Sequence, residues 1–260
     1  MKGLSTGYIE RFGGIGRLYG EAALARFQKA HVAVVGIGGV GSWVAEALGR
    51  SGIGTLTLVD LDDICLTNTN RQIHATDSTI GHSKVRIMAK RLKAINPEVV
   101  IHEQHLFYGE STSSTFFASP CSAVVDAIDS VRQKTHLLAT AREKGIPIVT
   151  VGGAGGRTDA SRIKVADLSV SRGDRLLMLT RKKLRQEYRF PRTGKGKFKI
   201  PCVYSDELPK FPLADGSVCE TRPDNTPGGL NCDAGLGSAT HVTASMGFFA
   251  TGLVLEALGR

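Results

Sequence analysis

The chain has 260 residues, of which 42% are hydrophobic and 22% charged, and it contains 31 glycines. This composition excludes a disordered chain, and the length suffices for one large α/β domain that needs no disulfides or metals for stability. The five cysteines form no C-x-x-C pair, which argues against a structural zinc site and a disulfide framework. The first residues lack an apolar run of signal-peptide length, so we expect a cytoplasmic protein.

Short apolar strands and amphipathic helices alternate through the first 151 residues. Strands are predicted over 31–36, 55–60, 99–101, 122–128 and 146–151, and helices over 40–49, 83–95 and 131–144. This alternation predicts an α/β fold with a Rossmann-like, doubly wound, mainly parallel sheet that has helices on both faces. A less regular C-terminal half follows, with one further strand over 162–168.

The segment 234–258 is apolar enough to require a membrane test. A membrane-spanning helix needs about 20 predominantly apolar residues. This segment is interrupted by Ser238, His241, Ser245 and Glu256. We therefore predict a buried C-terminal helix and no membrane partner.

All of the net charge of +9 lies between residues 172 and 199, which we call the basic segment. It contains eleven Lys or Arg residues against two acids, so the rest of the chain is neutral. Two interpretations stay open: a solvated, mobile loop, or a contact with a polyanion whose counterions are released on binding. In the second case the aromatic residues of the region could stack on unpaired bases. They are Tyr188, Phe190, Phe198 and Tyr204.

Residues 36–41 match G-x-G-x-x-G between a predicted strand and a predicted helix. Glycines in this position allow phosphates to approach the helix N-terminus closely, and Asp60 at the end of the next strand can bind a ribose. These features alone fit a nicotinamide dehydrogenase equally well.

Further polar residues favour a triphosphate over a dinucleotide. Asn68, Asn70 and Arg71 follow the second strand, and Lys84 opens the next helix. Cationic and amide groups of this kind bind phosphates. Asp126 and Asp129 follow the fourth strand, where one carboxylate could hold Mg²⁺.

Several longer stretches carry a family resemblance. HVAVVGIGGVG, TNTNRQIHA, GHSKV, DAIDS, VGGAGG and NCDAGLGSATHVTASMGF resemble the ThiF/MoeB type of the ubiquitin-activating-enzyme superfamily. Within that type, the chain is most similar to the tRNA threonylcarbamoyladenosine dehydratases, and the similarity covers nearly the whole sequence. The C-x-x-C zinc ligands of many relatives are absent.

The resemblance implies one adenylating domain over residues 10–260, with an ATP-binding core at 28–156 and a tRNA-facing, dimer-supporting part at 157–260. It implies ATP and Mg²⁺ as cofactors, a monovalent cation as a further ion, and a homodimer. The residues implied to contact the nucleotide are Gly36, Gly38, Gly39, Gly41, Asp60, Asp62, Asn70, Arg71 and Lys84. Asp129 would bind the metal, and a neighbouring subunit would contribute Arg17 or Arg11. Cys232 is either reactive or a small buried hydrophobe.

The family reaction is an ATP-dependent dehydration of N6-threonylcarbamoyladenosine at position 37 of tRNA. Carboxylate adenylation releases pyrophosphate, and ring closure then releases AMP. The partners implied are modified tRNA and a cysteine desulfurase with its sulfur acceptor. The candidate tRNA contacts are Arg181, Lys182, Lys183, Arg185, Lys195, Lys197 and Lys199. Three alternatives remain: activation of a small ubiquitin-like sulfur carrier, a nicotinamide dehydrogenase, and a non-catalytic RNA-binding module.

Overall fold

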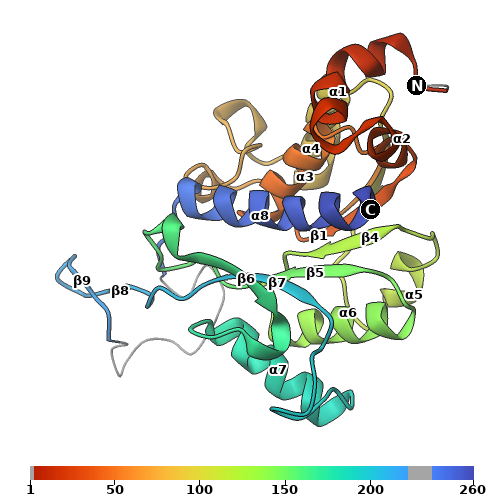
Figure 1. Ribbon diagram of the computed structural model, residues 1–260. Helices are drawn as coiled ribbons and strands as arrows, with labels where there is room; N and C mark the ends of the chain where they lie inside the picture. The colour runs from red at the N-terminus through yellow and green to blue at the C-terminus, as the bar shows by residue number, and fades with distance from the viewer. Residues whose placement is uncertain (1–2, 222–235) are drawn as a thin grey trace.

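A seven-stranded sheet forms the centre of the molecule, which we describe for residues 3–221 and 236–260 of a computed structural model (Figure 1). The strand order is β3-β2-β1-β4-β5-β7-β6, and every neighbouring pair is parallel except β6 with β7. The strands are β1 (His31–Val35), β2 (Thr55–Val59), β3 (Val100–Gln104), β4 (Ala123–Asp126), β5 (Ile148–Val151), β6 (Ile163–Asp167) and β7 (Pro201–Ser205). The predicted α/β fold with a mainly parallel sheet is confirmed.

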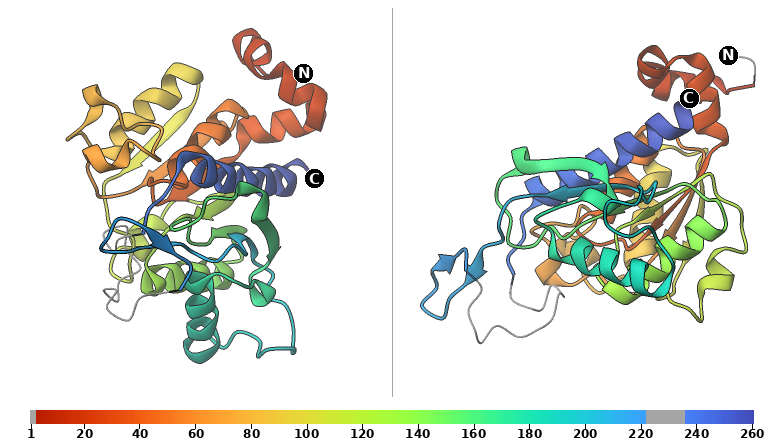
Figure 2. Two further views of the ribbon diagram at one scale, coloured as in Figure 1. Left: turned by 90° about the vertical axis from the view of Figure 1, so that its left-hand side faces the viewer. Right: turned by 60° about the horizontal axis from the view of Figure 1, so that its bottom comes forward.

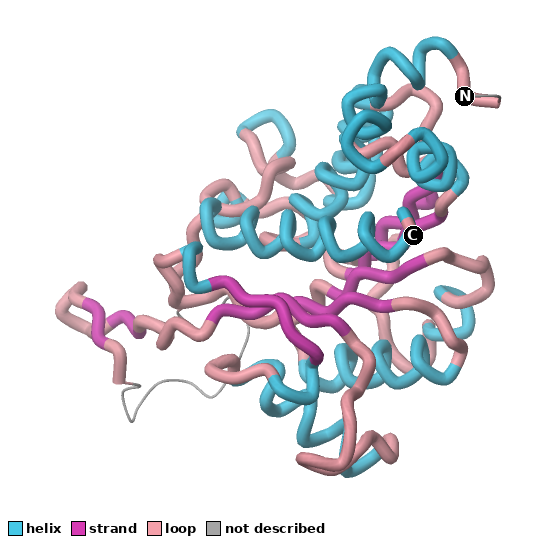
Figure 3. The backbone as a smooth tube through the Cα atoms, viewed as in Figure 1, coloured by secondary structure: helices cyan, strands magenta, loops and turns pink. Residues whose placement is uncertain are grey.

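Helices cover both faces of the sheet (Figures 2 and 3). On one face lie α2 (Glu21–Lys29), α3 (Gly41–Arg50), α4 (Lys84–Ile95) and α8 (Thr240–Gly259), and on the other lie α5 (Ser113–Phe116), α6 (Val131–Glu143) and α7 (Arg175–Glu187). Strand β1 shows why two layers form: Val32 and Val34 join the first core cluster, whereas Ala33 and Val35 join the second. A strand buried on both sides needs this continuous apolar sequence.

The chain reverses its direction of winding at β1. β1 pairs with β2 on one side and with β4 on the other, although α4, β3 and α5 lie between β2 and β4 in the chain. In open α/β sheets, ligands bind at such a reversal, outside the carboxyl ends of the strands. The glycine loop follows β1 and therefore lies there.

The C-terminal helix α8 is a core helix, as predicted. Val242, Met246, Ala250 and Val254 are fully buried in the first core cluster. Among the described residues, α8 is the helix whose length and composition would also suit a membrane span, with half of its apolar window buried inside the protein. Its packing against the sheet accounts for its apolar sequence.

The first half of the basic segment is the helix α7, which the sequence analysis did not predict. Asp174 caps it by accepting a hydrogen bond from Leu177 N at 2.8 Å. Leu177 and Leu184 belong to the second core cluster, and Leu176 is buried as well. The high density of Lys and Arg hid this apolar periodicity.

Several smaller elements were also not predicted. They include α1 (Thr6–Tyr19), the hairpin of β8 (Phe211–Pro212) and β9 (Val218–Cys219), and 3-10 turns at Leu66–Asn68, Asp77–Thr79, Ala160–Arg162 and Leu168–Val170. α1 packs at the amino ends of the strands, because Tyr8 Oη donates to Gly52 O at 2.5 Å just before β2. Ser5 Oγ likewise donates to Glu98, just before β3.

Candidate active site

The glycine loop makes a tight turn between β1 and α3. Gly36 has φ 90°, and a Cβ there would lie 2.9 Å from Ala127 O. A Cβ at Gly41 would lie 1.7 Å from Gly36 O. A Cβ at Gly38, in contrast, would meet no atom of the described residues within 4 Å. The outer glycines are thus required by the chain's own turn, whereas residues 3–221 and 236–260 leave space at the backbone of Gly38 that a phosphate can enter.

Asp60, Asp62 and Lys84 form a charged cluster beside this loop. Asp60 Oδ2 accepts a hydrogen bond from Ile37 N at 2.7 Å, so the acid at the end of β2 holds the glycine loop. Burial raises the pKa of Asp60, and the positive charge of Lys84 opposes that shift. Lys84 Nζ lies 2.7 Å from Asp62 Oδ2 and 3.9 Å from Asp60 Oδ1. The buried ammonium of Lys84 is therefore fixed beside the glycine loop, where a nucleotide would bind.

Arg71 crosses over the glycine loop. A Cβ at Gly39 would lie 3.3 Å from both Arg71 Cγ and Thr243 Cγ2. Arg71 Nη1 donates to Thr67 O at 2.7 Å and to Asn70 Oδ1 at 3.0 Å. Asn70 Nδ2 in turn donates to Ser238 O at 2.8 Å. The start of α8 thus fixes the segment that brings a guanidinium to the phosphate position.

The two carboxylates after β4 have different environments. Asp126 is fully buried, and its Oδ2 accepts hydrogen bonds from Lys134 Nζ at 2.7 Å and from Thr150 Oγ1 at 2.6 Å. Lys134 Nζ also donates to Thr150 Oγ1 and Val151 O. The carboxylate of Asp126 and the ammonium of Lys134 therefore both have their partners inside the protein. Asp129 is exposed, and no ion pair to it is found within residues 3–221 and 236–260. Of the two, Asp129 is the one available to a metal ion.

The buried pair also shapes the loop that carries Asp129. Ile128 N donates to Asp126 Oδ1 at 3.1 Å, and Ala127 N donates to Val35 O at 2.9 Å. Because Ala127 packs directly on Gly36 and Gly41, the loop after β4 and the glycine loop form one surface. The structure thus brings together the glycines, Asp60, Asp62, Asn70, Arg71, Lys84 and Asp129 at one edge of the sheet.

This arrangement suits a triphosphate with a divalent cation. Arg71, Lys84 and the N-terminus of α3 offer positive charge, and no side chain in the described part of the chain caps that helix end. Mg²⁺ is held by one or two carboxylates together with substrate phosphates. An exposed carboxylate beside an open phosphate position fits that requirement, although no cluster of three metal-ligating side chains occurs in the described parts of the chain.

The two N-terminal arginines lie away from this edge. Arg11 and Arg17 are exposed on α1, which packs at the amino ends of β2 and β3, the opposite edge of the sheet. Neither can therefore serve the glycine loop of its own subunit. Cys232 lies outside the described residues.

The candidate tRNA contacts fall into two groups. Three of them make contacts within the chain: Arg181 donates to Ser171, Lys183 pairs with Glu187 at 3.1 Å, and Arg185 donates to Pro191 O at 3.2 Å. The other four are exposed, and for none of them is an ion pair found within the described ranges: Lys182, Lys195, Lys197 and Lys199.

The proposed stacking of aromatic residues on bases is wrong for three of the four. Phe190, Phe198 and Tyr204 are buried, with exposures of 4%, 2% and 7%. Their rings fill the second core cluster instead, and Tyr188 packs against it. The mobile-loop interpretation is also weakened, because Phe190 and Phe198 anchor the loop between them.

Sequence reasoning missed one unusual residue near the site. His74 is 2% exposed, and neither ring nitrogen has a hydrogen-bond partner in the described structure. Burial lowers its pKa to about 4, with further lowering from the charges of Lys84 and Arg91. The imidazole is thus a neutral neighbour of the Lys84 ammonium. Its place in TNTNRQIHA, three residues after Arg71, was the feature of the sequence that could have indicated it.

Comparisons with known proteins agree with this geometry. A family model described as the ThiF family matches residues 14–258. The tRNA threonylcarbamoyladenosine dehydratase of Escherichia coli (strain K12) is 45% identical over 254 residues, which cover 97% of this chain and 95% of that protein.

Solved structures are similar along nearly the whole length. A structure described as "TcdA (CsdL)" aligns with a TM-score of 0.90 and 44% identity, covering 98% of this chain and 96% of that one. The E. coli dehydratase in complex with ATP aligns with a TM-score of 0.87 and 42% identity, with the same coverage.

Proposed function

Because the chain belongs to the ThiF family, we propose that it is an ATP-dependent tRNA threonylcarbamoyladenosine dehydratase. The observation that carries this proposal is the 45% identity to an enzyme of that name over 95% of its length. The convergence of Arg71, Lys84 and Asp129 beside an open glycine loop supports it. A related structure with bound ATP supports ATP as the nucleotide.

In the proposed reaction, the threonyl carboxylate attacks the α-phosphorus of ATP. A P–O bond forms, pyrophosphate leaves, and an acyl adenylate results. A nucleophile within the same modified side chain then attacks the acyl carbon, and AMP departs as the ring closes. AMP is a far better leaving group than oxide, so ATP drives the net loss of one water.

The chain's own residues would position the phosphates and neutralise their charge. Gly38 and the N-terminus of α3 would receive phosphate oxygens, and Arg71 and Lys84 would offset the charge that develops as pyrophosphate leaves. Asp60 and Asp62 would accept hydrogen bonds from the ribose. Asp129 would hold Mg²⁺, which supplies further neutralisation of phosphate charge when bound.

We further propose one adenylating domain over residues 10–260, with the ATP core at 28–156, working as a cytoplasmic homodimer. A shallow apolar groove of about 420 Å³ supports the dimer, and it is lined by Val165, Phe248, Phe249, Gly252, Leu253 and Glu256. Phe248 and Phe249 are 49% and 47% exposed, which is unusual for large apolar side chains on one helix turn. A trans-acting Arg17, a monovalent cation and a cysteine desulfurase partner stay predictions from the family resemblance.

The decisive experiment is mass spectrometry of nucleosides from threonylcarbamoyladenosine-containing tRNA after incubation with the protein and MgATP. We expect the modified nucleoside to lose the mass of one water, with AMP and pyrophosphate released in equal amounts. The Arg71→Ala variant is the control, and it should leave the nucleoside unchanged. Protein that releases neither AMP nor pyrophosphate would refute the proposal.

An ATP–pyrophosphate exchange assay tests the alternative of a sulfur-carrier activating enzyme. That enzyme would exchange pyrophosphate with ATP in the presence of a small protein ending in Gly-Gly, and modified tRNA would have no effect. The missing C-x-x-C pairs and the basic segment disfavour this alternative.

A further inference from the structure

The helix α7 carries an exposed strip along its whole length. Arg175, Met178, Lys182 and Gln186 are all exposed and recur at spacings of three or four residues, so they share one face. The loop 189–199, which we call the basic loop, continues from the end of this strip. It contains five exposed basic residues and no acidic residue: Arg189, Arg192, Lys195, Lys197 and Lys199.

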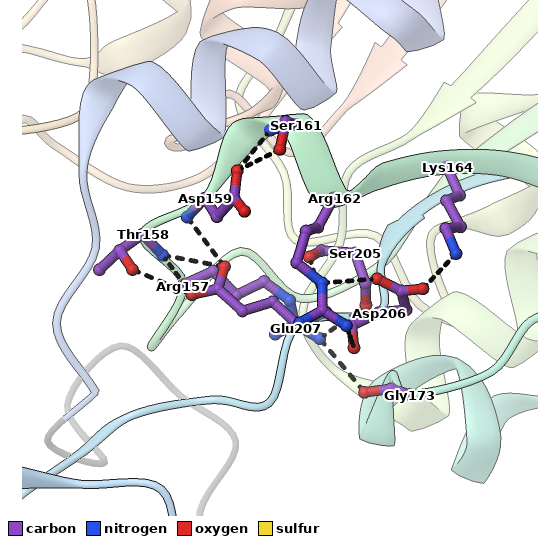
Figure 4. A network of polar contacts seen from close by, with 10 residues as sticks. All are labelled: Arg157, Thr158, Asp159, Ser161, Arg162, Lys164, Gly173, Ser205, Asp206 and Glu207. Carbon is purple, nitrogen blue, oxygen red and sulfur yellow. Dashed lines mark hydrogen bonds and ion pairs between the residues drawn. The ribbon is translucent and has the colours of Figure 1, made fainter.

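The first turn of α7 is fixed at the carboxyl ends of the parallel strands, which we call the carboxyl edge of the sheet; the amino edge is the opposite end of these strands. Asp174 Oδ2 accepts a hydrogen bond at 2.9 Å from Gly153 N, which lies just after β5. Arg157 Nη2 donates to Ser205 O at 3.2 Å and to Gly173 O at 3.4 Å (Figure 4). The same nitrogen lies 3.6 Å from Asp174 Oδ2. Arg157 and Asp174 are both buried. Because β5 neighbours β4, this end of α7 lies on the same edge of the sheet as Asp129.

The far end of α7 is fixed at the amino edge. The rings of Phe190 and Phe198 are 4.9 Å apart, and the Arg142 guanidinium lies 4.1 Å from the centroid of Phe190. Arg142 belongs to the last turn of α6, which has returned from the carboxyl edge. Asp167 accepts a hydrogen bond from Phe198 N at 3.0 Å. The basic loop is thus anchored at the opposite end of the sheet from the ATP position.

These anchors make α7 a rigid link between the two edges. A helix of 13 residues is about 20 Å long. A duplex strand carries a phosphate roughly every 3 Å along its axis, so α7 spans about six phosphates. Because the backbone that carries these charges is anchored at both ends, it loses little conformational freedom when the charges meet a regular row of phosphates.

We propose that the tRNA anticodon arm lies along α7, with the modified adenosine at the Arg175 end and the stem phosphates at Lys195 and Lys197. This inference rests on the proposed function and specifies how its substrate docks. The anticodon loop then meets the carboxyl edge, where ATP binds, while the paired stem runs toward the amino edge. In this arrangement the basic loop contacts the tRNA only at the phosphates of the anticodon stem.

The test combines two protein variants with substrates of three lengths. The substrates are whole modified tRNA, its anticodon stem–loop, and a trinucleotide centred on threonylcarbamoyladenosine. For Lys195→Gln/Lys197→Gln we expect the KM for tRNA and for the stem–loop to rise about tenfold, with a weaker dependence on salt and an unchanged kcat. The rate with the trinucleotide should not change. Arg175→Gln should raise the KM for all three substrates.

The control removes the same charge elsewhere. Lys90 and Lys93 are exposed on α4, which covers the other face of the sheet, and Lys90→Gln/Lys93→Gln should behave as wild type. Equal effects of Lys195→Gln/Lys197→Gln on the trinucleotide and on tRNA would overturn the proposal, and so would no effect on either. Dehydration of no substrate by the wild-type protein would instead refute the proposed function, so the two failures are distinguishable.

Discussion

Some residues of this site stabilise the fold, whereas others are exposed and available to the substrate. Asp126 and Asp129 lie three positions apart in DAIDS, and the sequence left open which of the two could hold Mg²⁺ until the family resemblance implied Asp129. In the structure the two differ, because Asp126 is hydrogen-bonded to a buried ammonium and a buried hydroxyl, whereas Asp129 is exposed. Which of two nearby carboxylates is buried depends on Lys134 and Thr150, which come from other elements, so local sequence could not decide it.

These two aspartates should respond oppositely to the same substitution. Asp129→Asn should keep wild-type stability and lose adenylation by at least about 100-fold. Asp126→Asn should lower the free energy of unfolding by about 3–5 kcal/mol, because it leaves the Lys134 ammonium buried without a counter-charge. Urea unfolding and tRNA-dependent pyrophosphate release measure the two effects. Loss of stability in Asp129→Asn would contradict the assignment.

His74 should make stability depend on pH. Its folded pKa of about 4 lies below the ordinary 6.5, so the unfolded chain binds more protons between these values. The His74 contribution is therefore complete above pH 6.5 and is lost as the pH falls toward 4, at up to about 1.4 kcal/mol per pH unit.

The variant His74→Leu should flatten this pH dependence, because an apolar side chain can replace an unpartnered imidazole. Urea unfolding at several pH values between 4.5 and 7.5 checks this. His82→Gln, at an exposed position, is the matched control and should keep the wild-type slope. If both variants keep it, His74 is not the group responsible.

At the scale of elements, sequence periodicity was sufficient wherever apolar residues followed a simple pattern. The strands 31–35 and 55–59 and the helix 84–95 differ from their predicted bounds by one residue. α7 was missed because its buried Leu176, Leu177 and Leu184 alternate with Lys and Arg. β7 was missed because it lies in a stretch rich in proline and glycine, and pairing with β5 and β6 defines it.

Substitutions should distinguish the role of Phe198, which anchors the basic loop, from the role of the loop's charges. Phe198→Ala should destabilise the protein by about 3–5 kcal/mol and expose 192–197 to protease, because it removes a buried ring. Affinity for tRNA should fall, while the slope of log affinity against log salt stays near the wild-type value. Lys195→Gln should do the reverse and reduce that slope. A changed slope in Phe198→Ala would show that the ring does more than hold the loop.

At the scale of the whole molecule, α1 lies at the wrong edge to serve its own ATP position. The family resemblance implied Arg17 as a contact from a neighbouring subunit, and that assignment stays a prediction, since α1 packs at the amino ends of the strands within one chain. No pattern in a single sequence reveals how two copies meet, so this part of the site could be predicted only from the family resemblance.

Mixing two inactive variants tests the contribution of Arg17. If Arg17 acts across the dimer, Arg17→Ala and Arg71→Ala homodimers should each be inactive. After the subunits exchange, about a quarter of wild-type activity should return, because half of the dimers are mixed and each has one complete site. Activity that does not return, in samples where native mass spectrometry detects mixed dimers, would place Arg17 outside the mechanism.

The position of α8 has a consequence for synthesis of the protein. This helix packs against β4, β5 and β7, and β5 emerges from the ribosome about 90 residues before α8. At 5–20 residues per second, this apolar face of the nascent sheet waits roughly 5–20 seconds for its cover. During that interval the growing chain lacks the helix that buries Val149 and Val151, so we expect a chaperone to bind it.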